Sequence, residues 1–160
     1  MSFLQIISVA FLSKNEAALY IANELSNFGV GLMFPIDYCT LRTLDVDKRA
    51  GNLLPIGFSH DQALGTLEFY NWWAKVYRKP GYPSLFVDQA FAGKRGEPSL
   101  ILDWVHTYGD QCFHHICILV ENIEYAIEKM KSRNIEFSGQ IVGYSNMDLR
   151  QVFTQPEIKK

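Results

Sequence analysis

The chain has 160 residues, of which 48% are hydrophobic and 20% are charged, and its formal net charge at pH 7 is -2. That length suits one domain or two small modules that share a core. The weak negative charge offers no broad attraction for nucleic acid or an anionic membrane, so we expect neither as a partner. The apolar segment 3–12 is too short to span a bilayer and has no basic flank before it, which argues against a membrane span and a signal peptide.

The cysteines indicate a reducing compartment. Cys39, Cys112 and Cys117 are odd in number and show no C-x-x-C spacing. This pattern argues against a disulfide framework and against a zinc knuckle. We therefore expect a cytoplasmic protein.

The first predicted helix follows a capping box. Ser13 and Glu16 have the spacing at which a serine oxygen and a glutamate each satisfy a free backbone N–H group. The helix that follows would end near Gly29. Periodicity does not decide whether the apolar segment before it is a helix or a strand.

The segment 37–44 is predicted to be a strand, since it is rich in β-branched and aromatic residues. Alternation along the strand places Tyr38, Thr40 and Arg42 on one face. A guanidinium group binds a carboxylate through two parallel hydrogen bonds, so Arg42, with Tyr38 beside it, is a candidate substrate-binding group. The alternative is an arginine that points into solvent from an edge strand.

The segment 45–64 contains scattered Asp, Gly, Asn and Pro residues and is predicted to be a long irregular connection. Such connections in compact domains are usually functional or disordered. His60 lies in this segment, beside Asp61, and is a candidate substrate-binding residue. The alternative is a surface histidine, because adjacent residues rarely face each other and no serine or cysteine motif accompanies the pair.

Two helices and one strand are predicted between residues 66 and 109. Aromatic and apolar residues recur at helical spacing from residue 69 to residue 77, which predicts a helix capped by Thr66. The segment 83–91 is predicted to be a strand. Ser99 is placed to cap a helix over residues 100–108, which Gly109 would end.

The segment 113–120 is the part of the chain around which the predicted elements of its last third are organised. It is largely apolar on both faces, which predicts a central strand covered on both sides. Alternation places His115 on one face and His114 on the other. A histidine on such a strand can point into the concave face of a sheet, toward a metal or a substrate. The alternative for His115 is a packed core histidine.

A helix capped by Asn122 and three short strands are predicted after this segment, the strands at residues 135–137, 140–143 and 149–154. Strand, helix and strands in this order predict an α+β fold whose sheet curves around a cavity.

The residues from His115 onward resemble one module of the vicinal-oxygen-chelate superfamily. The matching stretches are His-Ile-Cys-Ile-Leu-Val-Glu-Asn-Ile-Glu-Tyr-Ala-Ile-Glu-Lys-Met-Lys (115–131), Ile-Glu-Phe (135–137) and Leu-Arg-Gln-Val-Phe-Thr-Gln-Pro-Glu (149–157). Glyoxalases, methylmalonyl epimerases, extradiol dioxygenases and hydroxyphenylpyruvate-type dioxygenases belong to this superfamily. The resemblance implies an α+β fold of paired βαβββ-type modules, here residues 1–110 and 111–160, in a curved mixed sheet with helices on the outside. It also implies a divalent metal (Fe, Mn or Zn) with His115 as a ligand.

The stretch Tyr-Cys-Thr-Leu-Arg (38–42) resembles the 2-oxoadipate dioxygenase/decarboxylase branch of the same superfamily. In that branch a histidine ligand is expected where Tyr38 stands, with an arginine four residues later, as Arg42 is here. A second departure lies in segment 153–157, which corresponds to a turn before the strand that carries the glutamate ligand of the family. The sequence stops at Lys160, so the C-terminal module looks incomplete. Either the chain is a fragment, or it uses other ligands, or it binds no metal.

The resemblance implies a metal-dependent dioxygenase, lyase or isomerase that acts on a small oxo- or hydroxy-acid. His115 would bind the metal, Arg42 would hold the substrate carboxylate, and the protein could form a homodimer. The second function left open is a metal-free module of the same fold that binds a small molecule among Trp72, Trp73 and Trp104. The sequence assigns no residue a catalytic role.

Overall fold

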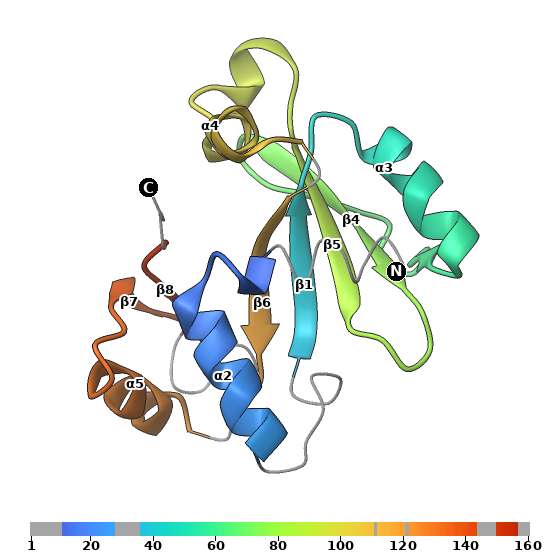
Figure 1. Cartoon of the computed structure of the whole chain (residues 1–160). Helices are drawn as coiled ribbons and strands as arrows, with labels where there is room; N and C mark the ends of the chain where they lie inside the picture. The colour runs from blue at the N-terminus through green and yellow to red at the C-terminus, as the bar shows by residue number, and fades with distance from the viewer. Residues whose placement is uncertain (1–10, 28–35, 111, 121, 144–149, 157–160) are drawn as a thin grey trace.

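A computed structural model gives the three-dimensional structure, and it describes residues 11–27, 36–110, 112–120, 122–143 and 150–156. In chain order the elements are α2 (Glu16–Asn27), β1 (Ile36–Arg42), α3 (Val46–Leu53), the 3-10 helix η1 (Leu54–Ile56), β2 (Ser59–His60), β3 (Thr66–Glu68), β4 (Trp72–Arg78), β5 (Ser84–Ala90), the 3-10 helix η2 (Gly93–Gly96), α4 (Leu100–Tyr108), β6 (Phe113–Ile118), α5 (Ile123–Lys131), β7 (Phe137–Val142) and β8 (Gln151–Thr154). Figure 1 shows these elements around a curved mixed sheet. The predicted α+β class is confirmed.

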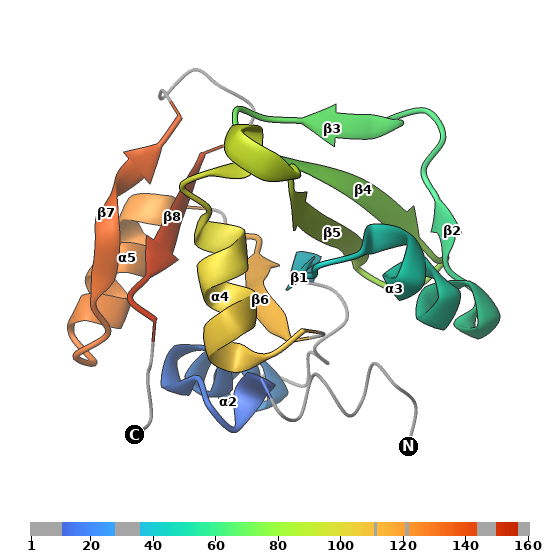
Figure 2. The ribbon, with the colours of Figure 1, turned by 90° about the horizontal axis from the view of Figure 1, so that it is seen from above.

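The main sheet has six strands in the order β2-β4-β5-β1-β6, and β3 pairs with β4 at its edge. β1 runs parallel to β5 and antiparallel to β6. The strands β7 and β8 form a separate antiparallel hairpin. Seen from above, this hairpin and α5 lie together on one side of the molecule, beside β6 (Figure 2).

The hydrophobic core lies on the face of the main sheet that carries Leu41 and Val87, where α3 packs. Val46, Ala50 and Leu53 of α3 are buried at i, i+4 and i+7, the spacing of one helix face. Full burial of a side chain such as Leu53 contributes roughly 1.5–3 kcal/mol. This core leaves the opposite face of the sheet for other side chains.

The prediction of an irregular connection over residues 45–64 is wrong, because the segment holds α3, η1 and β2. Asp45 caps α3 by accepting a hydrogen bond from the backbone N–H of Lys48 at 2.9 Å. The helix is only eight residues long and contains Gly51. Its stability therefore comes from tertiary packing of its buried face more than from the helix propensity of its sequence.

The predicted helix over residues 66–77 is also wrong: the segment folds as the β3–β4 hairpin. Ala74 and Val76 of β4 are buried on one sheet face, and Tyr77 is buried on the other. A strand that is covered on both faces shows no simple alternation, so its aromatic residues could match helical spacing by coincidence.

Several predicted elements are confirmed. Strands are present at the segments predicted around residues 37–44 and 83–91, and α4 spans Leu100–Tyr108 as expected. Ser99 caps α4 through the N–H of Leu102 at 3.1 Å, and Asn122 caps α5 through the N–H of Tyr125 at 2.8 Å. Side-chain oxygens at these positions satisfy N–H groups that have no partner within the helix.

Two boundary predictions need correction, and one lies outside the described residues. Asn15 accepts the N–H of Ala18 at 2.8 Å at the start of α2, where Ser13 was expected as the cap. One strand, β7, replaces the two short strands predicted over residues 135–143. The structure does not describe residues 1–10, which make up most of the apolar segment 3–12.

The strand β6 pairs only with β1 among the described residues, so it lies at the edge of the main sheet and is not the central strand that was predicted. Its pairing is also irregular. Thr40 lies opposite His115, but Leu41 lies opposite Phe113, so His114 is an extra residue in β6. Such a β-bulge redirects the side chain of the extra residue.

None of the helices in the described ranges is long and apolar enough to cross a membrane. Cys39, Cys112 and Cys117 are all free thiols.

Candidate functional site

The face of the main sheet opposite the α3 core carries polar side chains from three adjacent strands. Tyr38, Thr40 and Arg42 alternate along β1 on this face. The pairing places Asp88 of β5 beside Arg42, and His115 of β6 beside Thr40. We call Thr40, Arg42, Asp88, Trp104, His114 and His115 the polar cluster.

The bulge in β6 brings the two histidine rings together. His114 Nδ1 lies 2.7 Å from His115 Nδ1, and His115 Nε2 lies 3.1 Å from Thr40 Oγ1. The prediction that His114 and His115 lie on opposite faces is therefore wrong. Regular alternation would separate the rings, and the extra residue removes that alternation.

Arg42 is half-buried and forms no salt bridge within the part of the chain that the structure describes. Its Nη1 donates a hydrogen bond to the carbonyl oxygen of Leu100 at 2.9 Å, and its Nε is buried with no hydrogen-bond partner. Burial lowers the pKa of Arg42, against the opposing effect of Asp88. A half-buried positive charge without a salt bridge to a described residue would be stabilised by a negatively charged group placed next to it.

Asp88 is the carboxyl group nearest to Arg42 in the pairing, but its ionisation is suppressed. The side chain is 5% exposed, and burial raises its pKa to about 7 although the charge of Arg42 opposes the shift. Burial disfavours the charged form of a carboxyl group. Near pH 7 Asp88 thus compensates the charge of Arg42 only in part.

Trp104 of α4 links Arg42 with the histidines. The guanidinium carbon of Arg42 lies 5.9 Å from the centroid of the indole ring, and the His114 ring lies edge-on to it at 4.6 Å. Trp104 Nε1 is buried and, like Arg42 Nε, has no hydrogen-bond partner among the described residues. An N–H group left without an acceptor after burial costs roughly 1–3 kcal/mol, which a bound acceptor would recover.

Aromatic side chains border the polar cluster near β8. The Tyr38 hydroxyl donates a hydrogen bond to Gln151 Oε1 at 3.0 Å, and its ring lies 4.8 Å from that of Phe86. The ring of Phe153 lies edge-on to His115 at 5.2 Å. Burial, followed by the proximity of Cys117, raises the pKa of Tyr38, so this phenol stays protonated and can donate.

Both histidines of the polar cluster are neutral at pH 7. Burial lowers the pKa of His114 to about 2, and the charges of Arg42 and His115 add to that effect. Burial and the charge of Arg42 lower the pKa of His115 to about 4. A neutral imidazole carries one N–H donor and one acceptor nitrogen, so each ring can donate one hydrogen bond and accept another.

The described side chains do not form a site that fits the divalent metal implied by the resemblance. No group of three His, Cys, Asp or Glu residues that could hold a metal ion occurs in the described ranges. Both ring nitrogens of His115 are already within hydrogen-bond distance of Thr40 and His114. A protein metal site needs several convergent donors, so we derive no step through a metal here, and the metal stays a prediction.

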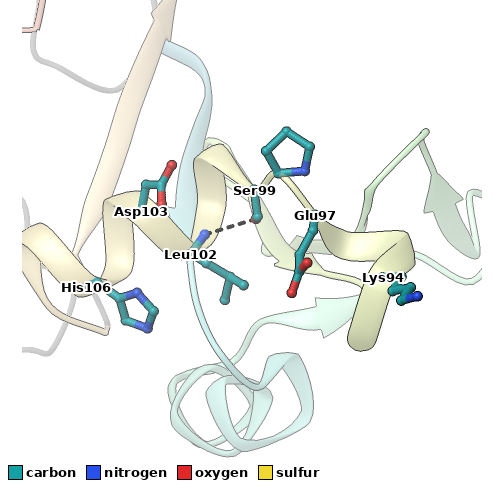
Figure 3. Close-up of a pocket in the computed structure, with 7 residues that line it drawn as sticks. Lys94, Glu97, Ser99, Leu102, Asp103 and His106 are labelled. Atoms are coloured by element: carbon teal, nitrogen blue, oxygen red, sulfur yellow. Dashed lines mark hydrogen bonds between the residues drawn. The ribbon is translucent and has the colours of Figure 1, made fainter.

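The structure shows two hollows, one away from the polar cluster and one that touches it at His115. One, of about 600 Å³, runs along η2 and the start of α4 and is lined by Lys94, Glu97, Pro98, Ser99, Leu102, Asp103 and His106 (Figure 3). The charged side chains of this hollow, and His106, are exposed to solvent. The other, of about 90 Å³, is a mainly apolar space between α2 and the strands β1 and β6, and His115 contributes to its lining.

The structure brings three of the four predicted site residues together: Tyr38, Arg42 and His115. His60 lies apart from them, on β2 at the other edge of the main sheet. Its Nε2 lies 3.0 Å from the carbonyl oxygen of Gly65, and its Nδ1 lies 3.1 Å from Gln62 Nε2. These contacts close the loop between β2 and β3.

Sequence reasoning missed His114, Asp88 and Gln151 as members of the site or its border. Asp88 could have been found from strand alternation, since it shares a face of β5 with Phe86. His114 could not, because nothing in the local sequence signals the bulge. Gln151 could not be found either, because its hydrogen bond with Tyr38 depends on where β8 lies in the folded protein.

No protein-family model matches the chain, and a search of curated proteins finds no match. Solved structures do match. The hypothetical protein BH1468 from Bacillus halodurans C-125 has a TM-score of 0.57 at 16% identity, over 76% of this chain and 83% of that chain. A "putative hydrolase" from Shewanella frigidimarina NCIMB 400 has a TM-score of 0.65 at 14% identity, over 94% of this chain and 87% of that chain. At these identities the likeness shows the fold alone.

Proposed function

We propose that this protein binds a small carboxylic acid, an oxo- or hydroxy-acid, on the polar cluster, and that it does so without a metal. The observation that supports this function is the state of Arg42. A half-buried guanidinium group that has no salt bridge to any described residue lies beside two neutral imidazoles and a carboxyl group whose pKa is raised to about 7. A carboxylate ligand would supply the missing negative charge.

Two N–H groups near Arg42 lack hydrogen-bond partners among the described residues, and their positions would determine which ligand binds. Arg42 Nε and Trp104 Nε1 are buried without hydrogen-bond partners among the described residues. A small acid that displaced the side chains covering these two atoms would accept hydrogen bonds from both, and the aromatic rings of Tyr38 and Phe86 provide an apolar border. Small-molecule sites commonly combine a few polar groups with apolar and aromatic surroundings.

The free thiols and the absence of a disulfide pattern support a cytoplasmic location.

The first prediction concerns Arg42→Lys. Lysine keeps the positive charge but removes Nε and the bidentate geometry of the guanidinium group. We expect the dissociation constant for pyruvate or lactate, measured by calorimetry in the presence of a chelator, to rise at least about tenfold, which is ~1.4 kcal/mol.

The matched control is Arg78→Lys. Arg78, the last residue of β4, forms a salt bridge with Asp61 at 2.5 Å, and more than half of its side chain is exposed. This variant should bind as the unchanged protein does. Equal affinity of the Arg42→Lys variant and the unchanged protein would contradict the proposed role of Arg42.

A metal-dependent dioxygenase, lyase or isomerase is the second candidate function. The observation in its favour is that His114 and His115 are neutral, the form in which imidazole binds a metal. We predict that protein purified without a chelator carries less than stoichiometric iron, manganese or zinc, because the described donors are too few. Stoichiometric metal that disappears in His115→Ala would establish the second candidate in place of the first.

A further inference from the structure

We propose that the hollow between α2 and β6 binds an uncharged aliphatic molecule of about three or four carbon atoms, such as a short-chain alcohol. Its volume is about 90 Å³, and its lining comes from α2 and the residues just before it, from β1, from β6 and from β8. Arg42 and Trp104 do not line it. The hollow is therefore a site separate from the one proposed for a carboxylate, and neither proposal depends on the other.

The walls of the hollow are mainly apolar. Ala17, Ala18 and Ile21 of α2 line one part of it, and Ile116 and Ile118 of β6 line another. Further apolar side chains come from β1 and from the segment before α2. Figure 1 shows α2 beside β6. Because an alanine side chain is only a methyl group, the two alanines do not fill the space between this helix and the strand, and an apolar hollow remains.

The volume of the hollow limits the size of its ligand. One water molecule takes up about 30 Å³ in the liquid, so a space of about 90 Å³ holds about three groups of that size. An isopropyl group has three carbon atoms and matches this volume. An apolar cavity that holds benzene has a volume of about 150 Å³, so an aromatic ring is too large for this hollow.

The hollow is partly open to solvent. Of the described side chains that line it, Ala17 alone is buried, at 4% exposure, and the others are half-buried. A small molecule can therefore enter from solvent while α2 stays folded.

An apolar group is favoured over water in this hollow, because the lining offers water few free partners. Both ring nitrogens of His115 lie within hydrogen-bond distance of His114 or Thr40, and Asn15 Oδ1 accepts a backbone N–H of α2 at 2.8 Å. A buried water needs roughly 2–4 polar partners. The hydroxyl group of Thr154 makes no hydrogen bond to a described residue, so it remains for the hydroxyl group of an alcohol.

The lining also selects against a charged ligand. None of the described residues that line the hollow is Asp, Glu, Lys or Arg. His115 is neutral at pH 7, because burial and the charge of Arg42 lower its pKa to about 4. A carboxylate or an ammonium group would lose hydration in this hollow without an opposite charge to compensate. The ligand expected here is therefore uncharged, unlike the acid proposed for the polar cluster.

The test is a titration of the full chain with isobutanol, followed through the ¹³C-labelled δ1 methyl groups of isoleucine. The signals of Ile116 and Ile118, assigned through Ile116→Val and Ile118→Val, should shift saturably. Isobutyrate carries the same isopropyl group beside a carboxylate and should bind at these signals at least about tenfold more weakly. Equal dissociation constants for the two compounds, or signals that do not move with isobutanol, would overturn the proposal.

A series of alcohols measures the size of the site. Each carbon atom transferred from water into the hollow should tighten binding roughly fourfold, so affinity should rise from ethanol to propan-1-ol to isobutanol. Benzyl alcohol should bind more weakly than isobutanol, because its ring exceeds the volume of the hollow. An affinity that continues to rise through benzyl alcohol would indicate an open apolar surface in place of a limited hollow, and would contradict the proposal.

Ala18→Leu tests the position of the site. Leucine adds three carbon atoms to the wall formed by α2, which fills the hollow, so the variant should lose isobutanol binding. The matched control is Ala63→Leu, which makes the same change at an exposed position in the loop between β2 and β3 and should keep the unchanged affinity. Isobutanol binding that persists in Ala18→Leu would place the ligand elsewhere and overturn the proposal.

Ile21→Val gives the opposite test and applies even where Ala18→Leu fails to fold. The variant removes one carbon atom from the wall and enlarges the hollow. It should bind 3-methylbutan-1-ol, which is one carbon atom longer than isobutanol, more tightly relative to isobutanol than the unchanged protein does. An unchanged ratio of the two dissociation constants would contradict a ligand held against this side chain.

Discussion

Arg42 and Arg49 are two arginines of the core and the sheet that differ in burial and in their partners. Arg42 has no salt bridge in the described ranges, whereas Arg49 pairs with Asp110 at 3.5 Å. Arg49 is 0% exposed and lies on the buried face of α3. The unpaired arginine is the one expected to meet a ligand, and the paired one belongs to the core.

Asp110 connects Arg49 to the end of β1. Its Oδ1 accepts the hydroxyl group of Thr43 at 2.7 Å and the N–H of Leu44 at 3.2 Å, while Oδ2 lies 3.5 Å from Arg49 Nη2. The carboxylate thereby ties α3 to β1 and to the loop before β6.

Asp110→Asn should destabilise the fold by roughly 2–3 kcal/mol, near the lower end for a broken buried pair because Asp110 is partly exposed. Arg49→Met should cost less, since it removes the buried charge together with its need for a partner. Urea unfolding of both variants checks this order. A larger loss in Arg49→Met than in Asp110→Asn would show that the pair is net stabilising.

At the scale of secondary-structure elements, the sequence predicted the helices whose ends carry clear capping residues. It missed the elements that form only through contacts between distant parts of the chain. The helix α4 was predicted because Ser99 and Gly109 mark its ends. The helix α3 was missed because Gly51 and its short length hide the buried row that pairs with the sheet. The β3–β4 hairpin was missed because β4 is covered on both faces.

The candidate site also contains some residues that one strand predicts and others that only tertiary contacts bring together. Arg42 and Tyr38 were predicted from alternation along one strand, and the structure keeps them on one face. The pairing of His114 with His115 needs the bulge, which arises only when β6 pairs with β1. The raised pKa of Asp88 needs burial by other elements, which a local pattern does not contain.

Gly51→Ala tests the account of α3. Gly51 lies in the helix interior, and a Cβ atom at this position would meet nothing within 4 Å. We expect the variant to raise the free energy of unfolding by roughly 0.5–1 kcal/mol, because alanine loses less backbone entropy on folding.

Gly96→Ala is the contrasting control. A Cβ atom there would overlap the carbonyl oxygen of Phe91, so this variant should destabilise the protein. Destabilisation by Gly51→Ala, measured in the same urea series, would mean that α3 is not the helix described.

At the scale of the whole molecule, the polar cluster should make stability depend on pH. His114 and His115 have lowered pKa values in the folded state, so the unfolded chain binds two more protons below about pH 6.5. Asp88 has a raised pKa of about 7, so the folded state binds one more proton between about pH 4 and 7. The net difference is one proton in favour of the unfolded chain.

Stability should therefore fall as pH is lowered from about 6.5 to 4.5, by at most ~1.4 kcal/mol per pH unit. Asp88→Asn removes the opposing effect and should make this dependence steeper. Urea unfolding at intervals of half a pH unit checks both statements. A stability that rises on acidification over this interval would contradict neutral, buried imidazoles.

The main sheet has one face that α3 covers and an opposite face that carries Arg42, and we propose that the second face binds a ligand. The solved structures that resemble this chain support the fold.

The indole N–H signal of Trp104 in a ¹H–¹⁵N spectrum tests that claim most directly, since this donor has no partner among the described residues. Assigned through Trp104→Phe, the signal should shift saturably as pyruvate is added with a chelator present, while the signals of Trp72 and Trp73 stay in place. The shift should be lost in Arg42→Lys. A Trp104 signal that does not move, or one that moves equally in Arg42→Lys, would contradict a carboxylate site on this face.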